Sequence, residues 1–510
     1  MRNTFLYIAA ILFVSSCSPA KNTTTGTDDG RISINFVQVN DVYEIAPLSQ
    51  GNEGGMARVA TIKQKYLEHN PNTFLVMAGD FLSPSVYNSL KYQGKNIRGK
   101  QMVEAMNAAG FDFAIFGNHE FDIKEAELQE RINESKFQWI SSNTFHKLNN
   151  TVVPFEKNGS SPFPETFIKT VKDADGTTAR IGFIALTLPF NKASYVSYKD
   201  AFATAKELYN KLKDSVDAVV ALTHQSMEED EILAKQIPGL AVIMGGHEHD
   251  QKFEKVAGVS ITKAMANAKS AFIVRLSINK NTHSVKVSTK LEILDETIPL
   301  NSECNSVVQK WVTIAESSYA SLGFDAKKIV LGEGEPLDGR ESEIRSHATN
   351  LTRLIVSAMT NAAPKADVAI MNAGSIRVDD ILQMPVSQYD ILRTLPFGGS
   401  IREVDMKGSL LIKILDQGVK NKGIGGYLHV NETVSFNTDS SRWELKNNAI
   451  DPAKIYRVAL PDFLLTGGES NLGYLKAGNS DIVKIYDAQT ALTEPMSDIR
   501  LAVIKYLEKK

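Results

Sequence analysis

Side chains that can bind metals follow five short strand-like runs in the first half of the chain. Aspartate, asparagine or histidine stands directly after each run, often beside glycine. The motifs are Asn40-Asp41, Gly79-Asp80, Gly117-Asn118-His119-Glu120, Thr223-His224 and Gly245-Gly246-His247-Glu248-His249. Ligands of α/β sheets bind beyond the carboxyl ends of the strands, so we expect these side chains to meet at one rim.

The chemistry of these side chains suits divalent cations. Carboxylate and amide oxygens mixed with imidazole nitrogens favour Zn, Mn or Fe. One carboxylate can bridge two cations about 3.5–4 Å apart, where a water loses a proton near neutral pH and becomes a nucleophile. Taken singly, an aspartate after a strand more often forms a turn, and a lone histidine is more often structural. Because four of the nine histidines directly follow expected strands, the set as a whole predicts a metal centre.

The segment 31–300 alternates β-rich runs with helix-like stretches, which predicts an α/β sandwich. The helix-like stretches have apolar residues at three-to-four spacing. Two later runs, 260–263 and 270–278, are expected to close one sheet. The other predicted strands are 32–39, 73–78, 113–116, 180–186, 218–222 and 240–244, and the predicted helices are 56–69, 100–109 and 201–214.

The second part of the chain predicts a smaller α/β domain. An amphipathic helix over 301–323 is expected to connect the domains, and helices near 349–362 and 407–420 flank a strand at 367–371. A chain of 510 residues is longer than one hydrophobic core usually holds. The expected division is a first domain over 31–300, a linker over 301–325 and a second domain over 326–510.

The bulk composition argues against two classes of protein, those that bind nucleic acid polymers and those stabilised mainly by disulfides. A net charge of -3 gives no reason to expect binding to a nucleic acid polymer. The two cysteines, Cys17 and Cys304, exclude a disulfide framework as the main source of stability.

The N-terminus predicts export and a lipid anchor. An apolar run over 4–14 follows Arg2 and leads into Val14-Ser15-Ser16-Cys17. The run is too short to cross a bilayer, so it predicts a signal peptide over 1–17. Small residues before Cys17 resemble a bacterial lipobox, which implies a lipid-anchored protein of the cell envelope, periplasmic or in the outer membrane; the alternative is a secretory signal with an incidental cysteine. The polar segment 18–30 predicts a flexible tether.

In their order, the motifs resemble those of the calcineurin-like metallophosphoesterases and, within them, the 5'-nucleotidase family. The resemblance implies a four-layer α/β/β/α catalytic domain, a long helix and a smaller substrate-binding domain. It implies that Asp80 bridges two metal ions of the set Zn, Mn, Mg or Co. The matching stretches also include Gly54-Gly55-Met56-Ala57-Arg58 and Phe121-Asp122.

The same resemblance implies a role for each residue of the first domain. Asn118, His224 and His247 would complete one metal site, while Asp41 and His249 would serve the other. His119 would stabilise the transition state and help the leaving group, and Asp122 would orient it.

In the second domain, the resemblance implies a nucleoside-binding site. The matching stretches are Leu337-Asp338-Gly339-Arg340, Arg345 with Thr349-Asn350-Leu351, residues 372–377, Leu395-Pro396-Phe397-Gly398-Gly399 and residues 462–469. Phe397 and Phe463 would sandwich the base. Arg345 and Arg377 would hold charged or hydroxyl groups, with Asn372 assisting. Without the resemblance, the two phenylalanines would be assigned to the core and Arg377 to a surface ion pair.

Two departures from the family pattern concern the sites. The family has histidine where this chain has Tyr43, and neutral tyrosine is a poor ligand for most divalent ions. Either Glu44 or water fills the gap, or that site is weaker, and an oxygen-richer site would favour harder ions such as Mn or Mg. Glu469, assigned to the substrate site, stands where the family has aspartate.

The function expected from these observations is hydrolysis of nucleoside phosphates to nucleoside and phosphate. Nucleotide sugars and cyclic nucleotides are neighbouring substrates. One alternative is a thiosulfonate-type sulfur-ester hydrolase on the same fold, and the other is a non-catalytic nucleotide-binding lipoprotein.

Overall fold

The structure is a computed structural model that describes residues 28–190 and 193–509. The predicted signal peptide, Cys17 and nearly all of the predicted tether lie outside these residues. None of the helices in the described ranges is long and apolar enough to span a membrane.

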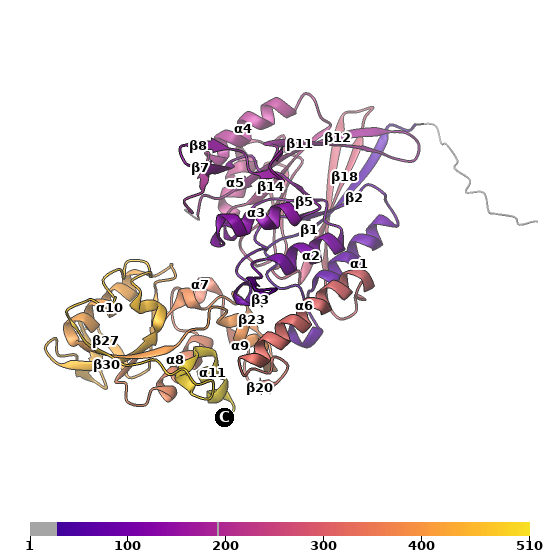
Figure 1. The fold of residues 1–510 in the computed structure, drawn as a ribbon. Coiled ribbons are helices and arrows are strands. Elements are labelled where there is room, and N and C mark those ends of the chain that lie inside the picture. Colours follow the sequence, from indigo (N-terminus) through magenta and orange to yellow (C-terminus); the bar gives the residue numbers. More distant parts are fainter. Residues whose placement is uncertain (1–27, 191–192, 510) are drawn as a thin grey trace, which may run out of the picture.

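Two mixed sheets packed face to face form the first domain (Figure 1). Over the described residues, each sheet has six strands, in the orders β19-β18-β1-β2-β5-β6 and β11-β12-β14-β15-β17-β16. The strands of the first sheet are β1 (Arg31–Val39), β2 (Thr73–Met77), β5 (Phe113–Ala114), β6 (Gln138–Trp139), β18 (Ser270–Asn279) and β19 (Ser284–Ile293). Those of the second are β11 (Thr166–Lys172), β12 (Thr178–Thr187), β14 (Ala218–His224), β15 (Val242–Gly246), β16 (Lys252–Val256) and β17 (Val259–Lys263).

The apolar runs of the sequence fill the space between the sheets. Phe36, Phe74 and Phe113 of the first sheet lie in one buried cluster with Phe183 and Val220 of the second. Helices α1 (Met56–Leu67) and α2 (Lys100–Ala109) cover the first sheet, and α6 (Ser302–Ser321) packs on these two helices. Helices α4 (Ala201–Leu212) and α5 (Met227–Gln236) cover the second sheet. Strands buried on both faces need no polar alternation, which explains their continuous apolar sequences. The predicted four-layer sandwich is confirmed.

Parallel pairing carries the candidate metal ligands to one rim. Strand β2 pairs in parallel with β1 and β5, and β14 pairs in parallel with β15. The carboxyl ends of these strands therefore face the same way within each sheet. One expectation was wrong: β17 and β18 do not close one sheet, because β17 pairs with β15 in the second sheet and β18 pairs with β1 in the first.

Helix α6 connects the domains. The side chain of Asn301 caps it by accepting from the backbone N–H of Cys304. Its buried face contains Val308, Trp311 and Tyr319 and packs on α1 and α2. The helix therefore belongs to the first domain along most of its length, and its end leads into the second (Figure 1).

The second domain has a central sheet with helices on both faces. The described strands follow the order β26-β22-β30-β25-β31, with α10 on one face and α8 and α11 on the other. The strands are β22 (Val368–Asn372), β25 (Ile401–Lys407), β26 (Leu428–Val430), β30 (Ile455–Pro461) and β31 (Ile482–Ile485). The helices are α8 (Asn350–Ala362), α10 (Gly408–Lys420) and α11 (Ile499–Leu507).

Candidate metal centre and nucleoside pocket

Three predicted ligands gather at the rim of the first domain. Asp41 follows β1, Asp80 follows β2 and His224 ends β14. One ligand atom from each lies within 4.8 Å of the others, and all three side chains are buried. Buried charged groups persist only when they are paired or hold a metal, so this cluster is a metal-binding group.

The backbone of these loops is strained where the ligands attach. The torsion angle φ is 53° at Asp41, 54° at Asp80, 99° at His247 and 59° at His249. Residues other than glycine rarely adopt this left-handed conformation, and those that do cluster at functional sites. A Cβ atom on Gly117 would lie 2.1 Å from Asp80 Oδ1, so this position requires glycine.

Buried atoms without hydrogen bonds show that the residues fit a cation. Among the described residues, neither His224 Nε2 nor Asn118 Oδ1 has a hydrogen-bond partner. Asp80 Oδ2 lies 3.1 Å from His224 Nε2, but the geometry is not that of a hydrogen bond. The other ring nitrogen, Nδ1, donates to the carbonyl of Ala78 at 2.8 Å, which leaves the lone pair of a neutral ring on Nε2. With the ring neutral, both atoms offer electron pairs to a third partner.

The neighbouring carboxylates favour the protonated form of His224. Burial lowers the pKa of His224, but the carboxylates of Asp80 and Asp41 outweigh burial and raise it to about 9. Burial raises the pKa of Asp80, but His224 and His119 outweigh it and hold that pKa below its usual range. A cation would replace the proton of His224, so we expect metal binding to release protons.

His247 lies on the His224 side of the centre. The two rings are 5.5 Å apart in an edge-to-face arrangement. Burial and then the charge of His224 lower the pKa of His247 to about 4. Its backbone N–H donates to Asp41 Oδ2 at 2.9 Å, which fixes the loop on the carboxylate. A neutral imidazole is the form that binds metals.

His249 and Tyr43 lie on the other side of the centre. The Tyr43 hydroxyl lies 2.9 Å from His249 Nε2, and His249 Nε2 lies 3.4 Å from Asp41 Oδ1. Burial and the carboxylates of Asp80 and Asp41 raise the pKa of Tyr43 well above its ordinary value. Glu44 points away, because its carboxylate accepts hydrogen bonds from Tyr389 and Ser85. The suggestion that Glu44 fills the position of the missing histidine is therefore wrong.

Glu120 fixes the loop that carries Asp80, the candidate bridging ligand. Its carboxylate accepts hydrogen bonds from the backbone N–H groups of Asp80 at 2.9 Å, Phe81 at 2.7 Å, Leu82 at 3.0 Å and Gly117 at 2.6 Å. Burial and Asp80 outweigh these bonds and raise its pKa to about 7. Glu120 belongs to a motif recognised in the sequence, but its positioning role was missed there.

A loop of the second domain reaches the first-domain histidines. Arg377 lies 3.4 Å from His119 Nε2, while His119 Nδ1 faces Asp122 at 2.6 Å. Asp379, two residues further on, lies 2.6 Å from His249 Nδ1. Sequence reasoning missed Asp379, because no local pattern marks a residue that acts across domains.

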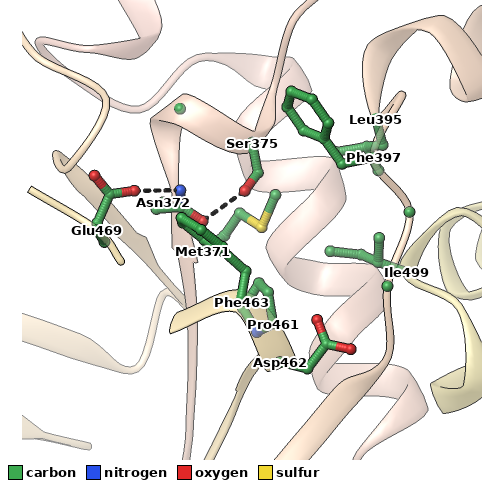
Figure 2. Close-up of a pocket in the computed structure, with 13 residues that line it drawn as sticks. Met371, Asn372, Ser375, Leu395, Phe397, Pro461, Asp462, Phe463, Glu469 and Ile499 are labelled. Atoms are coloured by element: carbon green, nitrogen blue, oxygen red, sulfur yellow. Dashed lines mark hydrogen bonds between the residues drawn. The ribbon is translucent and has the colours of Figure 1, made fainter. Parts of the chain in front are cut away.

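Four of the predicted substrate residues line one cavity of about 500 Å³ in the second domain (Figure 2). Phe397 is 64% exposed and Phe463 is 44% exposed, although both are large apolar side chains. Asn372 donates to Glu469 at 2.6 Å and accepts from Ser375 at 2.8 Å. Exposed aromatic faces beside a fixed polar pair suit a flat ring with hydrogen-bonding edges.

The two predicted arginines lie outside the lining of that cavity as the structure describes it. Arg377 faces His119 instead. Arg345 forms an ion pair with Glu341, and burial and then Arg377 lower its pKa to about 10. The structure thus separates the predicted substrate residues into a ring-binding group and a cationic group.

Comparison with known proteins assigns both halves of the chain. Residues 34–251 match the calcineurin-like phosphoesterase family, and residues 330–476 match the 5'-nucleotidase C-terminal domain. The 5'-nucleotidase of Bos taurus is 26% identical over 470 residues, which cover 82% of this chain and 78% of that protein.

Solved structures share the fold. A 5'-nucleotidase precursor from Thermus thermophilus superposes with a TM-score of 0.69 at 20% identity, covering 94% of this chain and 96% of that one. A sulfate thiohydrolase, SoxB, from the same species superposes with a TM-score of 0.63 at 15% identity, covering 93% and 94%. The domain that matches the phosphoesterases contains the metal-binding cluster, and the domain that matches the 5'-nucleotidases contains the aromatic cavity. The chain therefore belongs to the 5'-nucleotidase family.

Proposed function

We propose that this protein hydrolyses nucleoside phosphates, releasing nucleoside and phosphate, with two divalent cations. One observation carries the proposal: the chain has both a buried Asp–His cluster and a cavity with two exposed phenylalanines. When bound, the cations polarise the phosphate oxygens and activate the attacking water. Asp80 Oδ2 lies within 3.3 Å of groups on both sides of the centre, which supports its role as the bridging ligand.

His119, Asp122 and Arg377 would act on the phosphate. Asp122 fixes His119 through Nδ1 and leaves Nε2 facing Arg377. The planar donor fork of Arg377 would bind phosphate oxygens, and His119 would give a proton to the leaving oxygen. Arg377 and His119 lie together at this site, so they are preorganised for an anionic substrate.

The loop 372–377 would link the two halves of the substrate. Asn372 lies at the cavity and Arg377 at the catalytic histidine. Five residues of extended chain reach at most about 17 Å, and Ala373–Ser375 form a 3-10 turn, so base recognition and phosphate binding lie close together along one loop. We expect a rotation of the domains about helix α6 to bring the bound nucleotide to the metal centre.

The alternative functions fit the site less well. A thiosulfonate offers no ring to stack on Phe397 and Phe463, although the sulfate thiohydrolase comparison shows that the fold itself accommodates other chemistry. A protein that only binds nucleotides has no need of the His119–Asp122 pair.

The test is phosphate release from AMP by the metal-depleted full chain after addition of Zn, Mn, Mg, Co or Fe. We expect release from AMP with at least one metal and no hydrolysis of a thiosulfonate. Hydrolysis of the thiosulfonate alone would establish the sulfur-ester alternative. Binding of AMP without turnover under every metal would establish the binding alternative.

For the location, we propose a lipid anchor at Cys17 in a bacterial envelope. The apolar run ending in small residues before Cys17 supports it. Incorporation of a labelled fatty acid into the expressed protein tests the proposal. Loss of the label in Cys17→Ala is expected, whereas an unlabelled wild-type protein would refute the anchor.

A further inference from the structure

The Tyr43 hydroxyl faces three other candidate ligand atoms at once. It lies 3.5 Å from Asp41 Oδ1, 3.3 Å from Asp80 Oδ2 and 2.9 Å from His249 Nε2. His249 Nε2 in turn lies 3.4 Å from Asp41 Oδ1. Tyr43 is only 7% exposed, so its hydroxyl has little access to water.

Hydrogen bonds from Tyr43 satisfy only part of this arrangement. Carboxylate oxygens only accept, and a hydroxyl has one proton to donate. Asp379 lies 2.6 Å from His249 Nδ1, so that nitrogen faces the carboxylate and Nε2 is the ring atom that faces Tyr43 and Asp41. Tyr43 can therefore donate to only one of the two carboxylate oxygens, whereas a cation among the four atoms would bind them all.

The separations match those between neighbouring ligands of one cation. With bonds of about 2.0–2.2 Å, the edges of a tetrahedral or octahedral shell are roughly 2.8–3.6 Å. The four measured separations, 2.9, 3.3, 3.4 and 3.5 Å, fall in this range.

Neighbouring contacts hold the tyrosine in place. The backbone N–H of Tyr43 donates to Asn267 Oδ1 at 3.1 Å. Its ring packs on the ring of His249, with the centroids 5.3 Å apart. The hydroxyl is thus preorganised at its position, as a metal ligand must be.

We infer that the Tyr43 oxygen is a ligand of the cation on the Asp41–His249 side, and that this site selects a hard ion, foremost Fe(III). The inference rests on the proposed two-cation centre and names the ligand that replaces the expected histidine. Three oxygens and one imidazole nitrogen form the donor set. Carboxylate and tyrosinate oxygens are hard donors, and tyrosinate is an established iron ligand in proteins. On binding, the phenol O–H bond breaks, the proton passes to solvent and the oxygen–metal bond forms, with no change of oxidation state.

Visible absorption tests the inference independently of catalysis. The full chain is depleted of metal with a chelator and titrated with ferric citrate. We expect a charge-transfer absorption from phenolate to iron in the wild type, which Tyr43→Phe loses. Tyr195→Phe is the matched control, because Tyr195 is also buried but donates to the carbonyl of Ile123. Its spectrum should equal that of the wild type.

Metal binding provides the second measurement. Tyr43→Phe should weaken binding at one of two cation sites by at least about tenfold, the lower end of what altered metal surroundings cost. Tyr43→His should keep two sites, lose the absorption and bind zinc more tightly relative to iron, which also shows that the variant folds. A wild type without the absorption, or a Tyr43→Phe protein that retains it, would overturn the inference.

The outcomes separate this inference from the proposed function. If the charge-transfer absorption is present but AMP is not hydrolysed, the proposed function is refuted and Tyr43 remains supported as a metal ligand. Turnover of AMP without the absorption, and with unchanged metal binding in Tyr43→Phe, would remove the ligand assignment and leave the function.

Discussion

Glu44 makes the stability of the metal-free protein depend on pH. Its side chain is only 4% exposed and turns away from the metal centre toward the second domain. Burial raises its pKa, while Tyr389 and Arg393 lower it, and the net result is a pKa of about 7 instead of 4.5. The folded protein therefore binds a proton between these pH values that the unfolded chain has lost. The contribution of Glu44 to the free energy of unfolding is fully present below pH 4.5 and is lost as the pH rises through 7.

The size of the effect follows from the shift. A difference of about 2.5 pH units at 1.36 kcal/mol each is on the order of 3 kcal/mol. Glu44→Gln carries no charge at any pH, and its amide oxygen can still accept from Tyr389. Arg393 keeps its ion pair with Asp390 at 3.1 Å. The substitution should therefore stabilise the protein at pH 8 by most of that amount, or roughly 3 °C in Tm for a chain of 510 residues, and change little at pH 4.5.

Scanning calorimetry with a chelator present measures the effect without metal binding. Glu254→Gln is the control, because Glu254 is an exposed carboxylate on β16. Its Tm should match that of the wild type at both pH values. Equal Tm changes for Glu44→Gln at pH 4.5 and pH 8, or a loss of stability at pH 8, would refute the claim that burial raises the pKa of Glu44.

Three further substitutions test the proposed chemistry. His119→Ala should lower kcat for AMP by about 100- to 10,000-fold, as expected for a lost general acid, and unchanged kcat would remove that role. Phe463→Ala should raise KM for AMP by about 5- to 150-fold, from 1–3 kcal/mol of stacking, but leave KM for a small aryl phosphate nearly unchanged; equal effects would refute stacking. Gly117→Ala should weaken metal binding by about 10-fold or more, because its Cβ would displace Asp80, whereas Gly332→Ala, with open space around it, should not. Equal metal affinity in both variants would show that Asp80 adapts.

The metal-binding cluster could be predicted because it depends on strand ends. Parallel strands that end at one rim bring residues far apart in sequence together, as Asp41, Asp80 and His224 show. The apolar runs marked those strand ends well enough to place the ligands. It was harder to predict the sheet to which each strand belongs, because runs that are neighbours in the chain can pair with different partners, as β17 and β18 do.

Side-chain directions at the strained loop could not be predicted. Tyr43 stands at the position of the expected histidine and was judged a poor ligand, and its neighbour Glu44, or water, was expected to fill the gap. The left-handed backbone at Asp41 breaks the regular alternation of the preceding strand, so the sequence pattern no longer indicates which side chain points inward. The structure turns Tyr43 into the centre and Glu44 toward Tyr389.

The contact between the domains links the arrangement of the second domain to the state of the metal centre. Arg377 and Asp379 stand two residues apart in one loop, and each contacts a histidine of the first domain. A cation on His249 Nε2 would make the Nδ1 proton a stronger donor and so strengthen its bond to Asp379. By linkage, metal binding then favours the domain arrangement in which Asp379 reaches His249, and that arrangement binds the metal more tightly. Because Arg377 stands in the same loop and contacts His119, that arrangement would assemble the phosphate site and complete the metal surroundings together.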